Sequence, residues 1–213
     1  MYSCSVQVFN LLVDLFSQPD VLQSERIRVQ SKALRNVHVE YADDLGSLER
    51  TAELTGDELQ QHIAEYNRLF VLGQVSVPAP LFASYWLESD HLLLGKSIRP
   101  VEELLAAHEI VVDPSSGLTP DHLITELEFA AFLCEQDASE DLQALVAVHM
   151  QSWIPLFCAA LRAAQPSDFY CSSADLLERA VARVTTRQAI QPNDRQASFQ
   201  PLAGESHGSV QGT

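Results

Sequence analysis

Apolar residues recur at helical spacing along most of this chain, and this spacing constrains the fold more than any other feature of the sequence. In one segment they fall on every third or fourth position, at Leu59, Ile63, Tyr66 and Phe70. A second segment repeats the pattern at Leu123, Leu127, Ala130, Ala131 and Cys134. Strand-like alternation is confined to short runs that no Asn-Gly hairpin turn follows. The sequence therefore predicts an all-α protein.

Prolines and capping residues indicate where further helices begin or bend. The longest periodic stretch, residues 142–161, contains Pro155, which removes one backbone donor and predicts a kink or break near residues 151–154. Pro100 occupies a first-turn position and predicts a short helix. The Ser-x-x-Asp pattern that starts at Ser172 predicts the start of the last helix.

The expected organisation is a single helical domain of two lobes followed by a tail. A chain of 213 residues is long enough to bury one shared core without a metal or disulfides. Turn-forming residues at 112–117 place the joint between an N-terminal lobe, 1–113, and a C-terminal lobe, 118–189. Residues 190–213 are mostly polar, contain proline and glycine and show no period, so we expect a disordered tail.

Charge is distributed unevenly along the chain. There are 29 acidic and 13 basic residues, a net charge of −16. Residues 40–141 alone contain 21 acidic and 4 basic residues, a net charge of −17. A nucleic-acid binder is excluded because phosphate contacts need a basic face. The acidic stretch either attracts cationic ligands or peptides, or only keeps the protein in solution.

The cysteines and the uncharged segment Leu69–Leu87 bear on the cellular location. Cys4, Cys134, Cys158 and Cys171 match neither a metal-binding spacing nor a disulfide framework, so we expect reduced, mostly buried thiols in a cytoplasmic protein. The uncharged segment Leu69–Leu87 is interrupted by prolines and polar residues, which argues against a membrane span and against stable membrane insertion.

The uncharged segment Leu69–Leu87 is the first candidate for a functional surface. It is too rich in proline for one helix and too apolar for an ordinary solvated loop. It is either a buried connection with Phe82, Tyr85 and Trp86 in the core, or the wall of a groove for a hydrophobic peptide. A third interpretation is a permanent interface in a larger acidic complex, in which the chain is an architectural subunit.

A second candidate is the sequence Pro120-Asp121-His122. Pro120 is expected to open a helix with Asp121 in its first turn, where a carboxylate stabilises the unpaired amides. His122 is disfavoured there when charged, so a neutral imidazole that offers one donor and one acceptor to a partner is expected.

Catalytic chemistry is the minority interpretation. His122 and Glu126 stand one helical turn apart, so a metal-dependent hydrolase that uses both residues is the alternative function. No second histidine cluster, nucleophile elbow or phosphate-binding glycine loop accompanies them. We expect no enzyme, no metal and no cofactor, and we interpret His149 and Trp153 as core residues.

Three blocks of this sequence resemble the TorD/DmsD family of redox-enzyme maturation chaperones. The first is Tyr66-Asn67-Arg68-Leu69-Phe70 followed by Gly73, Pro78, Pro80, Ser84, Tyr85 and Trp86. The second is Pro120-Asp121-His122 with Glu126-Leu127-Glu128-Phe129. The third is residues 149–157, His-Met-Gln-Ser-Trp-Ile-Pro-Leu-Phe. The match covers about residues 59–161, and the order and spacing of the blocks are specific.

The resemblance implies an all-helical cytoplasmic protein that binds the twin-arginine signal peptide of a molybdenum-cofactor oxidoreductase, of the DMSO or TMAO reductase type, and holds its apoprotein before export. It also implies a possible homodimer formed by domain swapping, for which residues 112–117 offer a joint. Phe82 and Leu81 depart from the family pattern, where some relatives carry tryptophan and proline, and this leaves the peptide preference open. By position, the resemblance implies groove residues Leu69, Phe70, Pro80, Phe82 and Trp86, and a polar rim of Pro120, Asp121 and His122.

Overall fold

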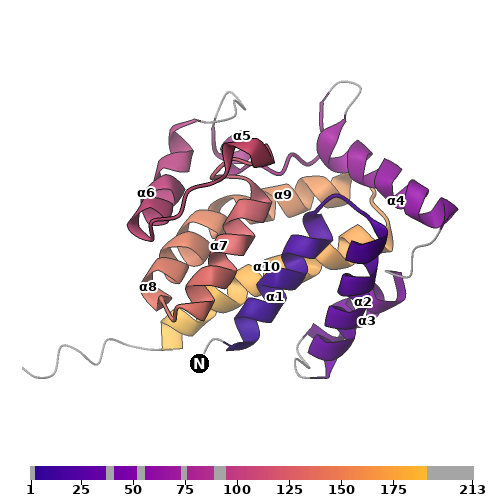
Figure 1. Ribbon diagram of the computed structural model, residues 1–213, viewed down its shortest axis with the longest axis horizontal. Coiled ribbons are helices and arrows are strands. Elements are labelled where there is room, and N and C mark those ends of the chain that lie inside the picture. Colours follow the sequence, from indigo (N-terminus) through magenta and orange to yellow (C-terminus); the bar gives the residue numbers. More distant parts are fainter. Residues whose placement is uncertain (1–2, 37–40, 52–55, 73–75, 89–94, 191–213) are drawn as a thin grey trace, which may run out of the picture.

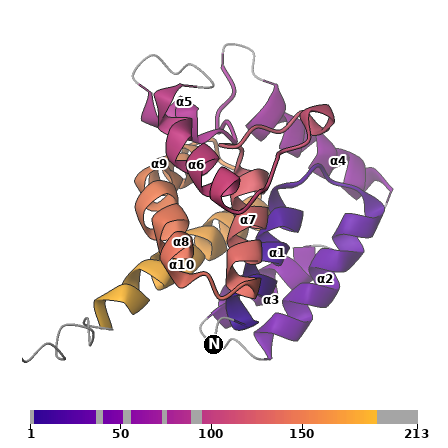
Figure 2. The same cartoon turned by 60° about the vertical axis from the view of Figure 1, so that its left-hand side comes forward.

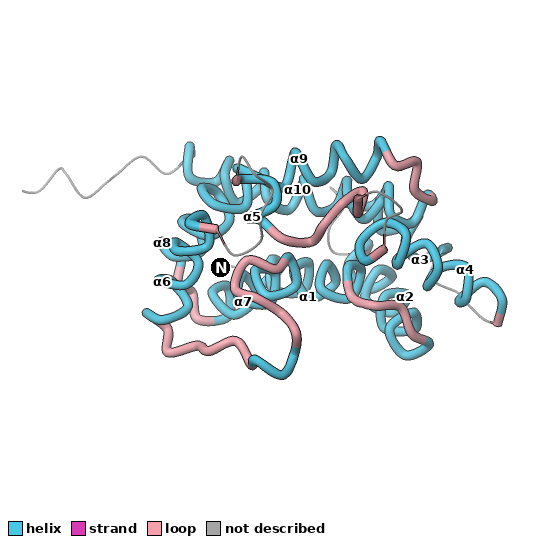
Figure 3. Tube along the Cα trace, turned by 90° about the horizontal axis from the view of Figure 1, so that it is seen from above, coloured by secondary structure: helices cyan, strands magenta, loops and turns pink. Residues whose placement is uncertain are grey.

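The computed structural model describes residues 3–36, 41–51, 56–72, 76–88 and 95–190. The α-helices are α1 (Ser3–Phe16), α2 (Val21–Arg35), α3 (Ala42–Thr51), α4 (Asp57–Tyr66), α5 (Ala83–Leu87), α6 (Arg99–Ala107), α7 (Leu123–Glu135), α8 (Ser139–Leu142), α9 (Gln151–Ala163) and α10 (Asp168–Ile190). The described residues also form two π-helical segments, η2 (Asn67–Val71) and η5 (Gln143–Met150), and the 3-10 turns η3 (Lys96–Ile98) and η4 (Pro114–Ser116). The described residues contain no strand beyond one isolated bridge, which confirms the all-α prediction (Figure 3).

Helix α1 lies at the centre of the fold. It packs against α7, α10 and α2, and α3 joins α2 to α10 on the same side (Figure 1). In a view turned by 60° from that of Figure 1, α2 and α3 form one flank of the molecule, and α8, α9 and α10 form the other (Figure 2). The middle of α1 is buried because Leu11, Leu12 and Leu15 recur at helical spacing and face these neighbours.

Aromatic rings connect the helices at the end of α1. Phe16 makes edge-to-face contacts with Phe70 of η2 and Phe157 of α9, with ring centroids 6.0 and 5.7 Å apart. Phe70 also contacts Tyr170 of α10 edge-to-face at 5.2 Å. Each such pair adds about 0.5–1.5 kcal/mol beyond the buried area. The cluster fixes the end of η2, which leads into the uncharged segment.

The sequence predicted three of the helices from periodicity and proline placement, and the structure confirms them. Helix α4 and η2 continue one another and bury Leu59, Tyr66 and Phe70. Helix α7 buries all five residues of the second periodic segment, and α6 carries Pro100 in its first turn.

The helical run Ser139–Ala163 passes through Pro155 without a break. Its hydrogen bonding changes from π to α at Gln151, whose N–H donates to the carbonyl of Val146, five residues back. The change falls within the range where the sequence predicted a kink or break, one helical turn before Pro155, whose missing N–H leaves the helix one hydrogen bond short. This run of 25 residues is long and apolar enough to cross a membrane by length and composition, and half of its most apolar window is buried in the fold.

The predicted start of the last helix is wrong. Helix α10 begins at Asp168, four residues before the expected cap. The Oγ atom of Ser173 donates to the carbonyl of Phe169 within the helix, at 2.8 Å. The turn before α10, where Gln165 has a positive φ of 51°, sets the earlier start.

One core extends across the predicted joint, since α1 packs against α7 and α10. The joint itself is a turn, in which Asp113 caps η4 and Gly117 takes a left-handed φ of 73°. The predicted tail lies outside the described residues from 191 onward. Of the cysteines, Cys134 and Cys158 are free and buried, Cys171 is free and half-buried, and the side chain of Cys4 is outside the described part.

Candidate functional site

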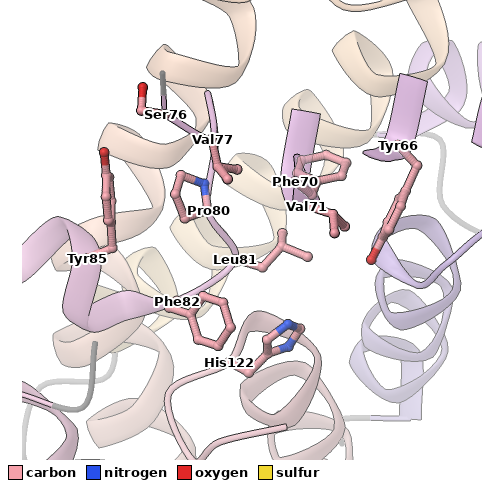
Figure 4. Close-up of a pocket in the computed structure, with 10 residues that line it drawn as sticks. All are labelled: Tyr66, Phe70, Val71, Ser76, Val77, Pro80, Leu81, Phe82, Tyr85 and His122. Atoms are coloured by element: carbon pink, nitrogen blue, oxygen red, sulfur yellow. The ribbon is translucent and has the colours of Figure 1, made fainter. Parts of the chain in front are cut away.

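An apolar cavity of about 490 Å³ opens where the end of η2, the segment 76–82 and the start of α7 meet. Figure 4 shows the residues that line it, with the Phe82 ring beside the imidazole of His122. The lining residues are Tyr66, Phe70, Val71, Ser76, Val77, Pro80, Leu81, Phe82, Tyr85 and His122. None of them carries a carboxylate, an ammonium or a guanidinium group. The cavity therefore suits an uncharged, mainly apolar ligand segment.

The segment 76–82 is held in place by hydrogen bonds at both of its sides. The Ala79 N–H donates to the Leu69 carbonyl at 3.0 Å. The indole Nε1 of Trp86 donates to the Pro80 carbonyl at 2.9 Å. These bonds explain how a proline-rich stretch keeps one fixed course between helices, because they pair backbone groups that lie outside any helix.

An isolated antiparallel bridge joins this segment to the loop before α7. Phe82 lies opposite His122, and the Leu123 N–H donates to the Leu81 carbonyl at 2.8 Å. The Ala83 N–H donates to the Asp121 carbonyl at 2.9 Å. Two of the three sequence blocks therefore meet at this bridge, although about forty residues separate them along the chain.

Asp121 is fully buried behind the cavity and does not line it. Its carboxylate accepts hydrogen bonds from the Ser84 N–H and Oγ, at 3.0 and 2.6 Å, and from the Thr119 Oγ1 at 2.6 Å. The expected place of Asp121 in the first turn of a helix is wrong, because Asp121 precedes the N-cap of α7 and fastens α5 to the loop instead.

His122 is the N-cap of α7, so the prediction that Pro120 opens this helix is also wrong. The imidazole Nδ1 accepts a hydrogen bond from the Ile124 N–H at 3.2 Å, and the ring meets Phe82 edge-to-face with centroids 4.9 Å apart. Burial lowers the pKa of His122 to about 4, although the nearby Asp121 charge opposes the shift. The imidazole is therefore neutral near pH 7, as the sequence suggested.

Glu126 has other partners than His122. Its Oε1 is 2.8 Å from His149 Nε2, and its Oε2 accepts from Trp153 Nε1 at 3.1 Å. Burial raises the pKa of Glu126, and the hydrogen bond to His149 lowers it less. His149 and Trp153 are core residues, as the sequence predicted. No group of three metal-ligating side chains is found within the described ranges, so no metal site supports the hydrolase alternative.

The structure brings together only some of the side chains that the sequence singled out. Phe70, Pro80, Phe82 and His122 line the cavity. Leu69 and Asp121 are buried behind it, and Trp86 and Pro120 are half-buried outside its lining. Sequence reasoning did not select the other six lining residues as site residues, although Tyr66 and Tyr85 belong to the blocks that carried the resemblance.

The sequence was compared with protein families and with known proteins, and both comparisons find similar sequences. The family model described as "Nitrate reductase delta subunit" matches residues 33–159. "Chaperone protein TorD" of Psychrobacter sp. is 33% identical over 113 residues, which are 48% of this chain and 50% of that protein. "Tat proofreading chaperone DmsD" of Salmonella typhi is 28% identical over 92 residues, which are 43% of this chain and 45% of that protein. The matches thus span about half the length of these relatives.

The fold is also found in a solved structure. A redox enzyme maturation protein from Archaeoglobus fulgidus superposes with a TM-score of 0.60 over 82% of this chain and 92% of that chain. The two sequences are 19% identical, so the likeness concerns the fold.

Proposed function

The chain belongs to the nitrate reductase delta subunit family, and from this premise we propose that it is a cytoplasmic maturation chaperone. In this proposal it binds the twin-arginine signal peptide of a molybdenum-cofactor oxidoreductase and holds the apoprotein before export. The names of the TorD and DmsD relatives support the proposal, and the family match over residues 33–159 includes all residues that line the cavity. The protein acts by binding and catalyses no reaction.

The cavity beside His122 is the observation that carries the proposal. Twin-arginine signals join a dibasic head to an uncharged apolar stretch. A cavity of about 490 Å³ with an aromatic and aliphatic lining offers room for several apolar side chains of such a stretch. The segment 76–82 is already fastened in its course, which reduces the entropy lost when a peptide binds.

The surrounding charge supports a cationic ligand. All lining residues, from Tyr66 to His122, fall within residues 40–141, which carry a net charge of −17. A field of this sign accelerates association with a dibasic head and is screened by salt. Because Asp121 is buried, the steering comes from the many exposed acidic residues and not from Asp121 itself.

A synthetic leader peptide tests the proposal. The peptide carries two adjacent arginines followed by an uncharged apolar stretch, and its affinity is measured by fluorescence anisotropy at low and high salt. Ser76 is exposed at the edge of the cavity, so Ser76→Trp should block the cavity and weaken binding at least tenfold. Ala33→Trp on the exposed face of α2 is the matched control and should bind as the unaltered protein does. Equal binding by both variants would contradict the proposal.

A homodimer formed by domain swapping is part of this proposal. An exchange at residues 112–117 would separate α1 from α7 and α10 of its own chain and re-form the same packing between two copies. Light scattering on the chromatographically purified protein measures the mass directly. A monomer at all concentrations would remove the dimer from the proposal without affecting peptide binding.

A further inference from the structure

The hydrogen bonds of His122 assign the position of its ring proton. In a neutral imidazole one nitrogen carries the proton and donates, and the other accepts. Nδ1 accepts from the Ile124 N–H at the start of α7, so Nε2 carries the proton. The edge-to-face contact with Phe82 holds the ring in this orientation.

The Nε2–H group of His122 has no partner in the described part of the chain. The residue is 8% exposed and lines the apolar cavity. A ligand that excluded water from the cavity without offering an acceptor would leave this donor buried and unpaired, which weakens binding. A ligand that fills this cavity and excludes water therefore binds best when it brings an acceptor to Nε2.

We infer that His122 acts as an uncharged hydrogen-bond donor inside the cavity, where its Nε2–H donates to a main-chain carbonyl of the bound apolar segment. This inference rests on the proposed function, since it names how the same cavity holds its peptide. A main-chain carbonyl is the acceptor because every residue of an apolar segment has one, whereas its side chains have none. The contact is independent of the dibasic head of the peptide.

The groups that face His122 are consistent with an uncharged role. The neighbouring carboxylate of Asp121 is occupied by Ser84 and Thr119, and Glu126 is bound by His149 and Trp153. The other lining residues carry no charged side chain. The low pKa of His122, about 4, keeps the imidazole neutral across the range from pH 5.5 to 8.

Two substitutions distinguish the roles of the two ring nitrogens of His122. His122→Asn keeps an acceptor near the position of Nδ1 and so keeps the helix cap, but it removes the donor at Nε2. His122→Gln places an amide donor near the position of Nε2 and loses the cap. We expect His122→Asn to melt within a few degrees of the unaltered protein and to bind the leader peptide at least tenfold more weakly. His122→Gln should melt lower and bind within threefold of the unaltered protein.

Each variant is tested with two synthetic peptides, the dibasic leader and the same leader with both arginines replaced by glutamine. The loss in His122→Asn should be the same factor for both peptides and should stay constant from pH 5.5 to 8. A loss confined to the dibasic peptide, or one that changes across this pH range, would overturn the inference.

The remaining outcomes are also decisive. Equal binding of the dibasic leader by His122→Asn and by the unaltered protein would overturn the role of His122 and leave the proposed function standing. No binding of either peptide by the unaltered protein would overturn both. Nitrogen-15 NMR of the free protein adds a readout without peptide, since it should show the proton on Nε2 at every pH in the range, and a proton on Nδ1 would overturn the inference.

Discussion

The buried carboxylate of Asp121 accepts two hydrogen bonds from Ser84, one from the main-chain N–H at 3.0 Å and one from Oγ at 2.6 Å. This pairing fastens the first turn of α5 to the loop before α7. It stands next to the Phe82–His122 bridge, so it fixes two residues of the cavity wall although neither Asp121 nor Ser84 lines the cavity.

Removal of this carboxylate should destabilise the protein strongly. Asp121→Ala removes the two hydrogen bonds that the carboxylate accepts from the N–H and Oγ of Ser84, and hydrogen bonds to charged groups contribute about 1.5–3 kcal/mol each. We expect the free energy of unfolding to fall by about 3 kcal/mol in urea titrations. Ser84→Ala removes only the hydroxyl and should cost about half as much.

Asp113 provides a matched control for Asp121. It makes the same two bonds, to the N–H and Oγ of Ser115, both at 2.8 Å, but on the exposed surface. Water replaces these bonds when Asp113 is changed to alanine, so the loss should be much smaller. Similar losses in Asp113→Ala and Asp121→Ala would contradict the assignment of Asp121 as a buried fastening residue.

Glu126 should make stability depend on pH. Burial raises its pKa in the folded protein, so the folded state binds more protons than the unfolded state, and the contribution of this group to stability falls as pH rises above the ordinary glutamate pKa. In the Glu126→Gln variant the side chain at this position does not titrate. The stability difference between the unaltered protein and Glu126→Gln should therefore shift in favour of the variant from pH 5 to pH 8. Urea titrations at both values measure it, and a shift in the opposite direction would contradict the prediction.

Gly117 should be sensitive to substitution through backbone strain alone. Its φ of 73° is left-handed, and a Cβ atom there meets no other atom within 4 Å. Gly117→Ala should lower the free energy of unfolding by about 1 kcal/mol, whereas Gly117→Asn should lose less because asparagine tolerates this conformation. Thermal melts of the two variants make the comparison, and equal losses would show that side-chain type at this φ does not matter.

The fold can largely be predicted from the sequence, because the helical spacing of apolar residues indicates which side of a helix is buried. The periodicity predicts that the five apolar residues of α7 are buried, and they are. Of the four periodic residues in the earlier segment, Leu59, Tyr66 and Phe70 are buried and Ile63 is half-buried. Helix starts were less accessible. His122 caps α7 with a ring nitrogen, and the bond depends on tertiary contact with Phe82, which no local pattern encodes.

The residues that line the cavity could be predicted only in part from the sequence, for the same reason. Apolar residues that line the cavity and apolar residues buried behind it are of the same types and can be neighbours in the sequence, as Phe70 and Leu69 are. The sequence alone therefore does not distinguish them. Asp121 illustrates the polar case, since its sequence position suggested a helix cap and its true partner, Ser84, lies 37 residues away. The contacts that decide these roles are long-range.

The last prediction concerns Trp86, which the sequence placed in the groove and which the structure places beside it. The Trp86 Nε1 donates to the Pro80 carbonyl at 2.9 Å, and the ring packs edge-to-face against Phe157 with centroids 6.2 Å apart. Trp86→Phe keeps a ring against Phe157 and loses the bond, so stability should fall by about 1 kcal/mol. Leader binding should also weaken, because Pro80 is part of the cavity wall.

Trp153→Phe is the matched control for this prediction, because it removes a different indole hydrogen bond, the one to Glu126, away from the cavity lining. It should lower the free energy of unfolding by at least as much as Trp86→Phe, since its acceptor is a buried carboxyl group. Its affinity for the leader peptide should stay unchanged at a temperature where both variants are folded. If the two variants lost affinity in proportion to their loss of stability, Trp86 would have no specific part in shaping the cavity, and the effect would reflect general destabilisation.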